Sequence, residues 1–181
     1  MMRIRQAVAA VTLLIVLSAM GYAIAKKEAI LERGRTILLP TAPADPRSLM
    51  QGDYMRLGYA LTLFPDAEAI KTLPYKGHVV LTLDDKATAS FARLDDGTPL
   101  GDGEIRVLYR RTSTGWGRRG MKYAPDSYFF EEGQGPRFEG ARFVMVTVGE
   151  SGETVLVGLA DENGIRIPNQ TPVGPQADKP D

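Results

Sequence analysis

Residues 6–25 of this 181-residue chain read QAVAAVTLLIVLSAMGYAIA, a stretch without a single charged side chain. Its apolar part, Ala7–Ala25, is 19 residues long. A helix of that length spans roughly 28 Å, which is close to the thickness of the hydrocarbon core of a bilayer. A helix buried in a soluble domain is seldom apolar on every side. We therefore expect residues 7–25 to cross a lipid bilayer, preceded by a short basic tail at residues 1–6.

Two interpretations of this segment are open. In the first, the segment is a secretory signal peptide that is cleaved after Ala25. In the second, the helix continues through residues 26–33 as part of a retained anchor and ends at Gly34. The length of the apolar run and the two lysines that follow the cleavage position favour the anchor. We expect a transmembrane anchor helix, with its extension, over residues 7–33.

The formal net charge of zero conceals an asymmetry along the chain. Residues 1–35 carry six basic and two acidic side chains, whereas residues 36–181 carry sixteen basic and twenty acidic ones. The negative total of the second part argues against a nucleic-acid partner. The absence of cysteine excludes a disulfide scaffold and thiol catalysis. No cofactor motif and no metal-ligand spacing occurs around the single histidine, His78, so we expect no cofactor and no metal.

The sequence also bears on which side of the membrane the domain occupies. Counting the cations on both flanks of the apolar run slightly favours a cytoplasmic domain. A short basic segment before an apolar run is typical of export signals, however, and large domains are translocated largely regardless of their charge. We expect the domain to lie outside the cytoplasm.

Beyond residue 34 the sequence predicts a mainly β domain. Alternating or β-branched runs, separated by Asp- and Gly-containing turns, predict seven or eight short strands. These runs are residues 36–39, 54–63, 77–83, 87–94, 104–111, 123–131, 141–148 and 154–159. One short helix is expected at residues 65–72. The predicted fold is a compact, barrel- or sandwich-like β-rich domain over residues 34–167, followed by a disordered Pro-rich tail at residues 168–181.

An octet at the start of one predicted strand is the most distinctive motif. Residues 52–59 read GDYMRLGY, which spells Gly-Asp-Tyr-x-x-Leu-x-Tyr. Gly52 suits the turn into the strand, and the Asp53 carboxylate can accept a nearby backbone N–H. Leu57 and Tyr59 are expected to pack in the core, with the Tyr59 hydroxyl at a polar rim. This structural interpretation is the favoured one.

The octet and its flanking blocks resemble the GDYXXLXY family of bacterial membrane-anchored proteins. The flanking blocks are residues 34–39, 45–51, 129–134 and 137–143. The resemblance implies a single anchor and a β-rich domain, and it implies no particular activity. It also implies a multi-span membrane protein as a partner. Together with the orientation argued above, it places the chain in a bacterial inner membrane as a single-pass protein with a periplasmic domain.

A second interpretation of the octet is a shared polar pocket. In this hypothesis, side chains of the octet meet side chains of the second block, at residues 129–143. The residues concerned are Asp53, Tyr54, Arg56, Tyr59, Glu131, Glu132 and Arg142. The hypothesis requires the two blocks to lie side by side in the folded domain.

The basic and aromatic segment at residues 109–123 is a candidate interaction loop. It holds five cations and no acidic residue, and it contains the single tryptophan, Trp116. Tryptophan and arginine are enriched at membrane interfaces and at interaction hot spots. Trp116, Arg118 and Arg119 are therefore candidates for contact with anionic headgroups or with an acidic partner.

No catalytic residue is predicted, and the sequence favours an interaction or envelope-assembly component over an enzyme. The enzymatic alternative is a membrane-anchored hydrolase with a polar pocket near Ser48 and Asp53. The region loosely resembles the membrane-anchored signal peptidases, which use a serine nucleophile and a lysine base. The segment after Ser48 lacks that family's Ser-Met followed by Pro, and the candidate lysines lie in turn-like contexts.

Overall fold

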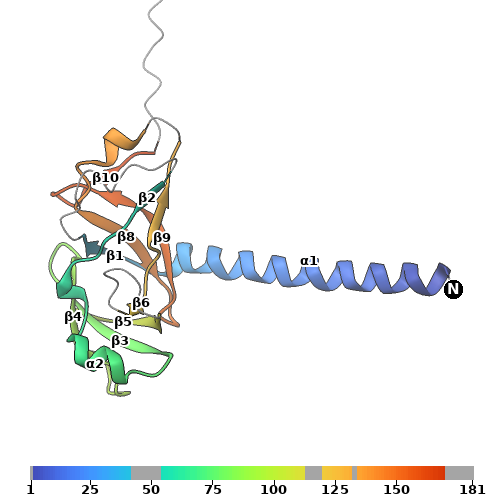
Figure 1. Ribbon diagram of the computed structural model, residues 1–181, viewed down its shortest axis with the longest axis horizontal. Coiled ribbons are helices and arrows are strands. Elements are labelled where there is room, and N and C mark those ends of the chain that lie inside the picture. Colours follow the sequence, from blue (N-terminus) through green and yellow to red (C-terminus); the bar gives the residue numbers. More distant parts are fainter. Residues whose placement is uncertain (1, 42–53, 113–119, 132–133, 170–181) are drawn as a thin grey trace, which may run out of the picture.

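A computed structural model of the chain describes residues 2–41, 54–112, 120–131 and 134–169 (Figure 1). A single unbroken helix, α1 (Met2–Arg33), projects from a β-rich domain. It begins five residues before the predicted anchor and ends at Arg33. Every described side chain from Ile4 to Ala29 is exposed, although most of them are apolar. In length and composition α1 fits a helix that crosses a membrane or a signal sequence.

Two four-stranded antiparallel sheets form most of the domain. The first contains, in order, β1 (Arg35–Pro40), β8 (Phe143–Val148), β9 (Thr154–Ala160) and β10 (Arg166–Ile167). The second contains β4 (Ala89–Leu94), β3 (Lys76–Leu83), β5 (Glu104–Arg111) and β6 (Met121–Lys122). A separate pair consists of β2 (Tyr54–Arg56) and β7 (Ser127–Phe129).

Three short helical segments complete the described elements. Helix α2 (Ala67–Thr72) lies within the predicted helix at residues 65–72. Single turns of 3₁₀ helix occur at Leu61–Leu63 and at Gly135–Phe138. Pro136 stands near the start of the second turn, where its missing N–H has no helical partner to lose.

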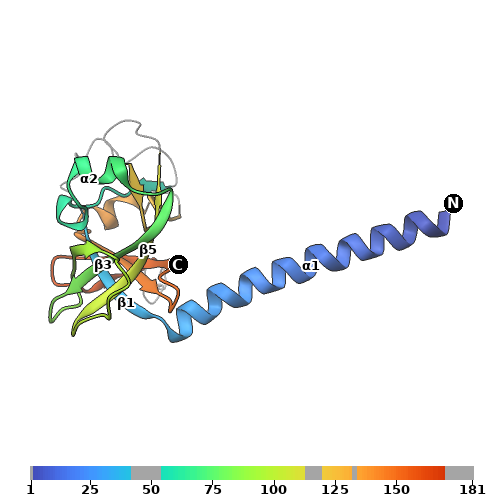
Figure 2. The ribbon, with the colours of Figure 1, turned by 90° about the horizontal axis from the view of Figure 1, so that it is seen from below.

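Backbone contacts join the two large sheets along both margins. At one margin, Leu38 forms a parallel bridge with Thr88, and its N–H donates to the Ala87 carbonyl at 2.9 Å. At the other, the Leu108 N–H donates to the carbonyl of Gly152, in the turn between β8 and β9, at 2.8 Å. The sheets therefore curl toward each other into a barrel-like enclosure (Figure 2), which confirms the predicted β-rich, barrel-like class.

The core fills the space between the inner faces of these sheets. Alternate residues of each strand face inward, as the pleat of a strand requires. The largest side chains that are fully buried there are Phe138, Ile37, Leu39, Leu63, Leu81, Leu159, Val79, Val107, Val144 and Val146. The strands predicted at residues 36–39 and 77–83 contribute runs of consecutive buried residues, 37–39 and 79–81, in place of one alternating face.

The strands predicted at residues 54–63 and 123–131 are shorter than expected. The first is extended only over β2, and the second only over β7, while β6 ends just before it. The pairing ends at the hydrogen bond from the Leu57 N–H to the Asp126 carbonyl, next to Pro125, whose ring holds φ away from the values typical of an antiparallel strand. The octet instead continues to a bridge between Tyr59 and Thr41, which links the small strand pair to the end of β1. Most of the predicted tail, residues 170–181, lies outside the described residues.

Candidate functional site

The octet and the second sequence block lie side by side in the structure. Strands β2 and β7 pair antiparallel, with Tyr54 opposite Phe129 and Arg56 opposite Ser127. Met55 and Tyr128, which are also opposite each other, are buried beneath the pair. Residues opposed in an antiparallel pair share one face. The other face, which includes the exposed Arg56 and the 71% exposed Phe129, is turned outward.

Only some of the side chains predicted to form a polar pocket belong to the described part of the chain. The exposed Glu131 accepts a hydrogen bond from Gln134 Nε2 at 2.9 Å. Arg142 Nη1 donates to the Glu139 and Ala141 carbonyls at 3.3 and 3.1 Å. No hydrogen bond or ion pair joins Arg56, Glu131 and Arg142 to one another among the described residues. A shared pocket therefore stays a prediction.

Several predicted residues lie outside the described residues. They are Ser48, Asp53, Trp116, Arg118, Arg119 and Glu132. The hydrolase alternative and the interaction loop depend on these positions, so both stay predictions. Among the described residues, no group of three or more histidine, aspartate and glutamate side chains could hold a metal ion.

The last tyrosine of the octet has a structural role. The Tyr59 hydroxyl donates to the Pro125 carbonyl, and its ring packs against the core. Burial, with a smaller contribution from the Asp126 charge, raises the pKa of Tyr59 above its ordinary value. The hydroxyl therefore stays protonated and keeps its donor at neutral pH. Leu57 is also buried, and its N–H donates to the Asp126 carbonyl at 2.9 Å.

A second tyrosine, Tyr123, forms a hydrogen bond between the same two segments, with donor and acceptor segments exchanged. The Tyr123 hydroxyl donates to the Leu63 carbonyl at 2.6 Å, and its ring lies 5.3 Å from that of Phe64. Burial raises the pKa of Tyr123 as well. Tyr59 and Tyr123 thus hold residues 59–64 and residues 123–125 together by two hydrogen bonds from phenols to backbone carbonyls.

The end of α1 docks on the turn between β8 and β9, an arrangement that the sequence reasoning missed. Ile30 is only 6% exposed, and a Cβ added at Gly149 would approach its Cγ1 to 2.8 Å. A Cβ at Gly34 would collide with the Ile30 carbonyl and come within 2.6 Å of Thr147 Cγ2. These two glycines therefore let the helix approach the sheet closely.

An ion pair extends the same contact toward the apolar part of α1. Lys26 Nζ lies 2.7 Å from Glu153 Oε1. The hydrogen bond from Lys26 is the main cause that lowers the pKa of Glu153, and the charges of Lys27 and Lys76 act in the same direction. The spacing of Lys26, Ile30 and Arg33 on one helical face is the sequence signal that could have indicated this docking.

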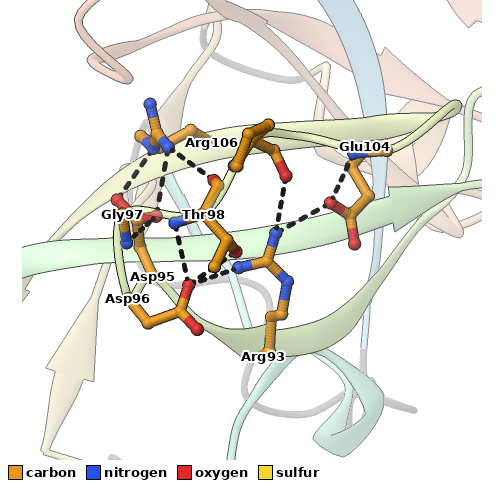
Figure 3. Close-up of polar contacts among 9 residues, drawn as sticks. Arg93, Asp95, Asp96, Gly97, Thr98, Glu104 and Arg106 are labelled. Carbon is orange, nitrogen blue, oxygen red and sulfur yellow. Dashed lines mark hydrogen bonds and ion pairs between the residues drawn. The ribbon is translucent and has the colours of Figure 1, made fainter.

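A charged cluster covers the outer face of the second sheet (Figure 3). Arg93 and Arg106 flank Val80 in register, one on each neighbouring strand, and Val80 has no exposed surface. Arg93 pairs with Asp96 and with Glu104, each at 3.0 Å. The stems of the two arginines and the loop that they hold therefore exclude water from an apolar side chain outside the core.

The carboxylates of this cluster also hold the backbone of the loop. Arg106 Nε lies 2.8 Å from Asp95 Oδ2. Asp96 accepts the hydroxyl and the N–H of Thr98 at 2.7 and 3.1 Å, and these bonds lower its pKa. Glu104 accepts the Gly101 N–H at 2.9 Å, and this bond, followed by that from Arg93, lowers its pKa. The bonding within the cluster indicates a structural role.

A comparison with models of known protein families assigns the chain to a family. The family model described as GDYXXLXY protein matches residues 16–159. The chain belongs to the GDYXXLXY family. The match runs from α1 into β9, so it includes the docked helix end, the octet and strands of both large sheets. No curated protein and no solved structure matches the chain.

The first prediction concerns the tyrosine that ends the GDYXXLXY motif. Tyr59→Phe removes the phenol and leaves the Pro125 carbonyl without that donor. We expect the free energy of unfolding to fall by about 1 kcal/mol, the usual net contribution of one hydrogen bond. The measurement is urea unfolding, and the control is Tyr75→Phe, because Tyr75 is 70% exposed. Equal effects of the two substitutions would contradict the structural role.

The second prediction concerns the pH dependence of the charged cluster. Because the folded-state pKa values of Asp96 and Glu104 are lowered, they stabilise the fold at neutral pH and lose this effect as the pH falls below about 4. In Glu104→Gln the oxygen acceptor remains but the charge is lost. We expect this variant to be less stable at pH 7 and to lose less stability between pH 7 and pH 3 than the wild type. The control is Asp102→Asn, at an exposed position of the same loop. A wild-type pH profile in Glu104→Gln would be the contrary result.

Proposed function

We propose that this member of the GDYXXLXY family is retained in the bacterial inner membrane by α1. In this proposal the β-rich domain lies on the periplasmic face, and the protein acts as an interaction or envelope-assembly component beside a multi-span membrane protein. The single observation that carries the proposal is the unbroken passage of α1 from its exposed apolar part into a docked contact with the domain.

The docked helix end supports retention of the anchor over cleavage. Cleavage after Ala25 would leave residues 26–33 as a helix of eight residues, and helices of that length are marginal in water. In the intact chain the same residues are the last turns of a 32-residue helix. The contact of Ile30 with the domain then joins the anchor and the sheet without an intervening linker.

The outward face of the β2–β7 pair supports a role in interaction. Phe129 and Arg56 are exposed on this face, and the octet's Tyr54 is placed opposite Phe129 in the strand register. Aromatic residues and arginine are enriched in the buried centres of protein interfaces. We therefore propose this face, defined by Arg56 and Phe129, as the contact with the membrane partner.

The third prediction tests retention and orientation, and it uses the absence of cysteine from the chain. Asn163→Cys places one thiol in an exposed loop of the domain, and Gln6→Cys places one at the other end of α1. In intact bacterial cells with a permeabilised outer membrane, we expect a membrane-impermeant maleimide to label Cys at position 163 before lysis and Cys at position 6 only after lysis. Intact mass should show the full chain.

Each of the other outcomes of this experiment has a defined meaning. A mass that lacks the first 25 residues would contradict retention of the anchor. Labelling of the position-163 thiol only after lysis would place the domain in the cytoplasm and contradict the periplasmic orientation.

The fourth prediction tests the interaction face. A photo-reactive benzoylphenylalanine at Phe129 should cross-link in membranes to one membrane protein. Because Arg56 lies on the same outward face, Arg56→Ala should reduce the yield of this product several-fold. The matched control carries the cross-linker at Tyr75, which is as exposed as Phe129 but lies just before β3, away from the β2–β7 pair. The same product at both positions, or no product at Phe129, would contradict the proposal.

A further inference from the structure

An open groove lies between the end of α1 and the turn from β8 to β9. Its volume is about 230 Å³. Its walls are formed by Lys26, Ala29, Ile30, Arg33, Gly34, Gly149, Glu150 and Ser151. Lys26 directly follows the apolar part of α1, and Arg33 lies roughly 10 Å further along the helix axis. If α1 is the anchor proposed above, the groove therefore lies at the level of the lipid headgroups.

The charges of the helix are divided between two faces at this level. The residues of α1 that line the groove stand at spacings of three, four and seven, which place them on one side of a helix. Lys26 and Arg33 belong to this side. Glu28 and Glu32 stand on the opposite side, at 100° per residue. The helical wall of the groove is therefore cationic, with its acidic residues directed away.

The two cations of this wall differ in their partners. Lys26 is paired with Glu153, as described above. Arg33 is exposed and has no hydrogen bond or ion pair within the described residues. The exposed Glu150 is the carboxylate that lines the groove from the other side. Arg33 is therefore the cation with free donors, and its planar guanidinium suits bidentate binding of a phosphate.

We propose that this groove binds the phosphate-bearing headgroup of an anionic phospholipid, with Arg33 as the principal contact and Lys26 as the second. The inference rests on the proposed anchoring of the chain by α1. The exposed apolar side chains of α1 before Lys26 favour a lipid over free phosphate, because acyl chains attached to the headgroup can lie along them. A lipid bound in this way would contact both the anchor and the β8–β9 turn, and so fasten one to the other.

The test uses the full chain in detergent micelles, titrated with phosphatidylglycerol or phosphatidylcholine of the same acyl chains. Native mass spectrometry measures the lipid bound to each protein molecule. We expect phosphatidylglycerol to bind at a several-fold lower concentration than phosphatidylcholine. Arg33→Gln should weaken phosphatidylglycerol binding by more than five-fold, which exceeds the roughly 1 kcal/mol that any cation contributes near an anionic surface.

The matched control is Arg35→Gln, which removes the same charge two residues away in β1, outside the groove. We expect it to change the affinity by less than five-fold. Similar effects of Arg33→Gln and Arg35→Gln, or equal binding of both lipids, would overturn the proposal. Loss of bound lipid on adding millimolar inorganic phosphate would identify a free-phosphate site and would also overturn it. Thermal unfolding of both variants checks that they are folded.

The lipid titration and the labelling experiment together distinguish failure of the lipid site from failure of the proposed membrane anchoring. A full-length, membrane-retained chain without preference for phosphatidylglycerol would remove the lipid site and leave the anchor. A chain cleaved after Ala25 in the labelling experiment would remove both proposals.

Discussion

The contact between Ile30 and the β8–β9 turn determines how the long helix and the β-rich domain are joined. Burial of an isoleucine side chain contributes about 2 kcal/mol. The partly exposed pair of Lys26 and Glu153 contributes less, because water and salt screen its charges. The apolar contact, together with Gly34 and Gly149, which leave room for it, is therefore the principal constraint at this junction. Because no linker intervenes, the direction of the helix sets the direction of the domain.

The octet divides between two roles because successive residues of a strand face opposite sides. Its inward residues, Met55 and Leu57, are buried, and Tyr59 donates to the Pro125 carbonyl. Arg56 is exposed and faces outward. Membership of the family by itself therefore does not show which residues of the octet serve folding and which would contact a partner. The strand register separates the buried residues of the octet from the exposed ones, and the proposed partner contact uses the exposed side.

Local patterns in the sequence were sufficient for the helix and for several strands. The runs at residues 77–83, 104–111 and 154–159 match β3, β5 and β9 to within one residue, because apolar and β-branched runs bounded by turn residues are local features of the sequence. The pairing of strands that are far apart in the sequence could not be predicted from such local patterns. The small pair of β2 and β7 joins two segments far apart in the sequence, and the Arg93–Arg106 cluster exists only because both residues register with Val80. Likewise, the cationic face of α1 is visible in the sequence, but the turn that receives it is not.

A domain that is docked on its anchor offers its neighbours a restricted set of faces. If a flexible linker joined the domain to the anchor, the domain would rotate freely and any of its faces would come into contact with membrane proteins. With Ile30 docked, the outward face of the β2–β7 pair keeps a set orientation relative to α1, so a partner in the same membrane would meet the same face in each molecule. A headgroup held by Arg33 would resist rocking of the helix against the turn and strengthen that restriction. The proposed partner contact and the proposed lipid site thus depend on one junction, and a change that loosened Ile30 would weaken both.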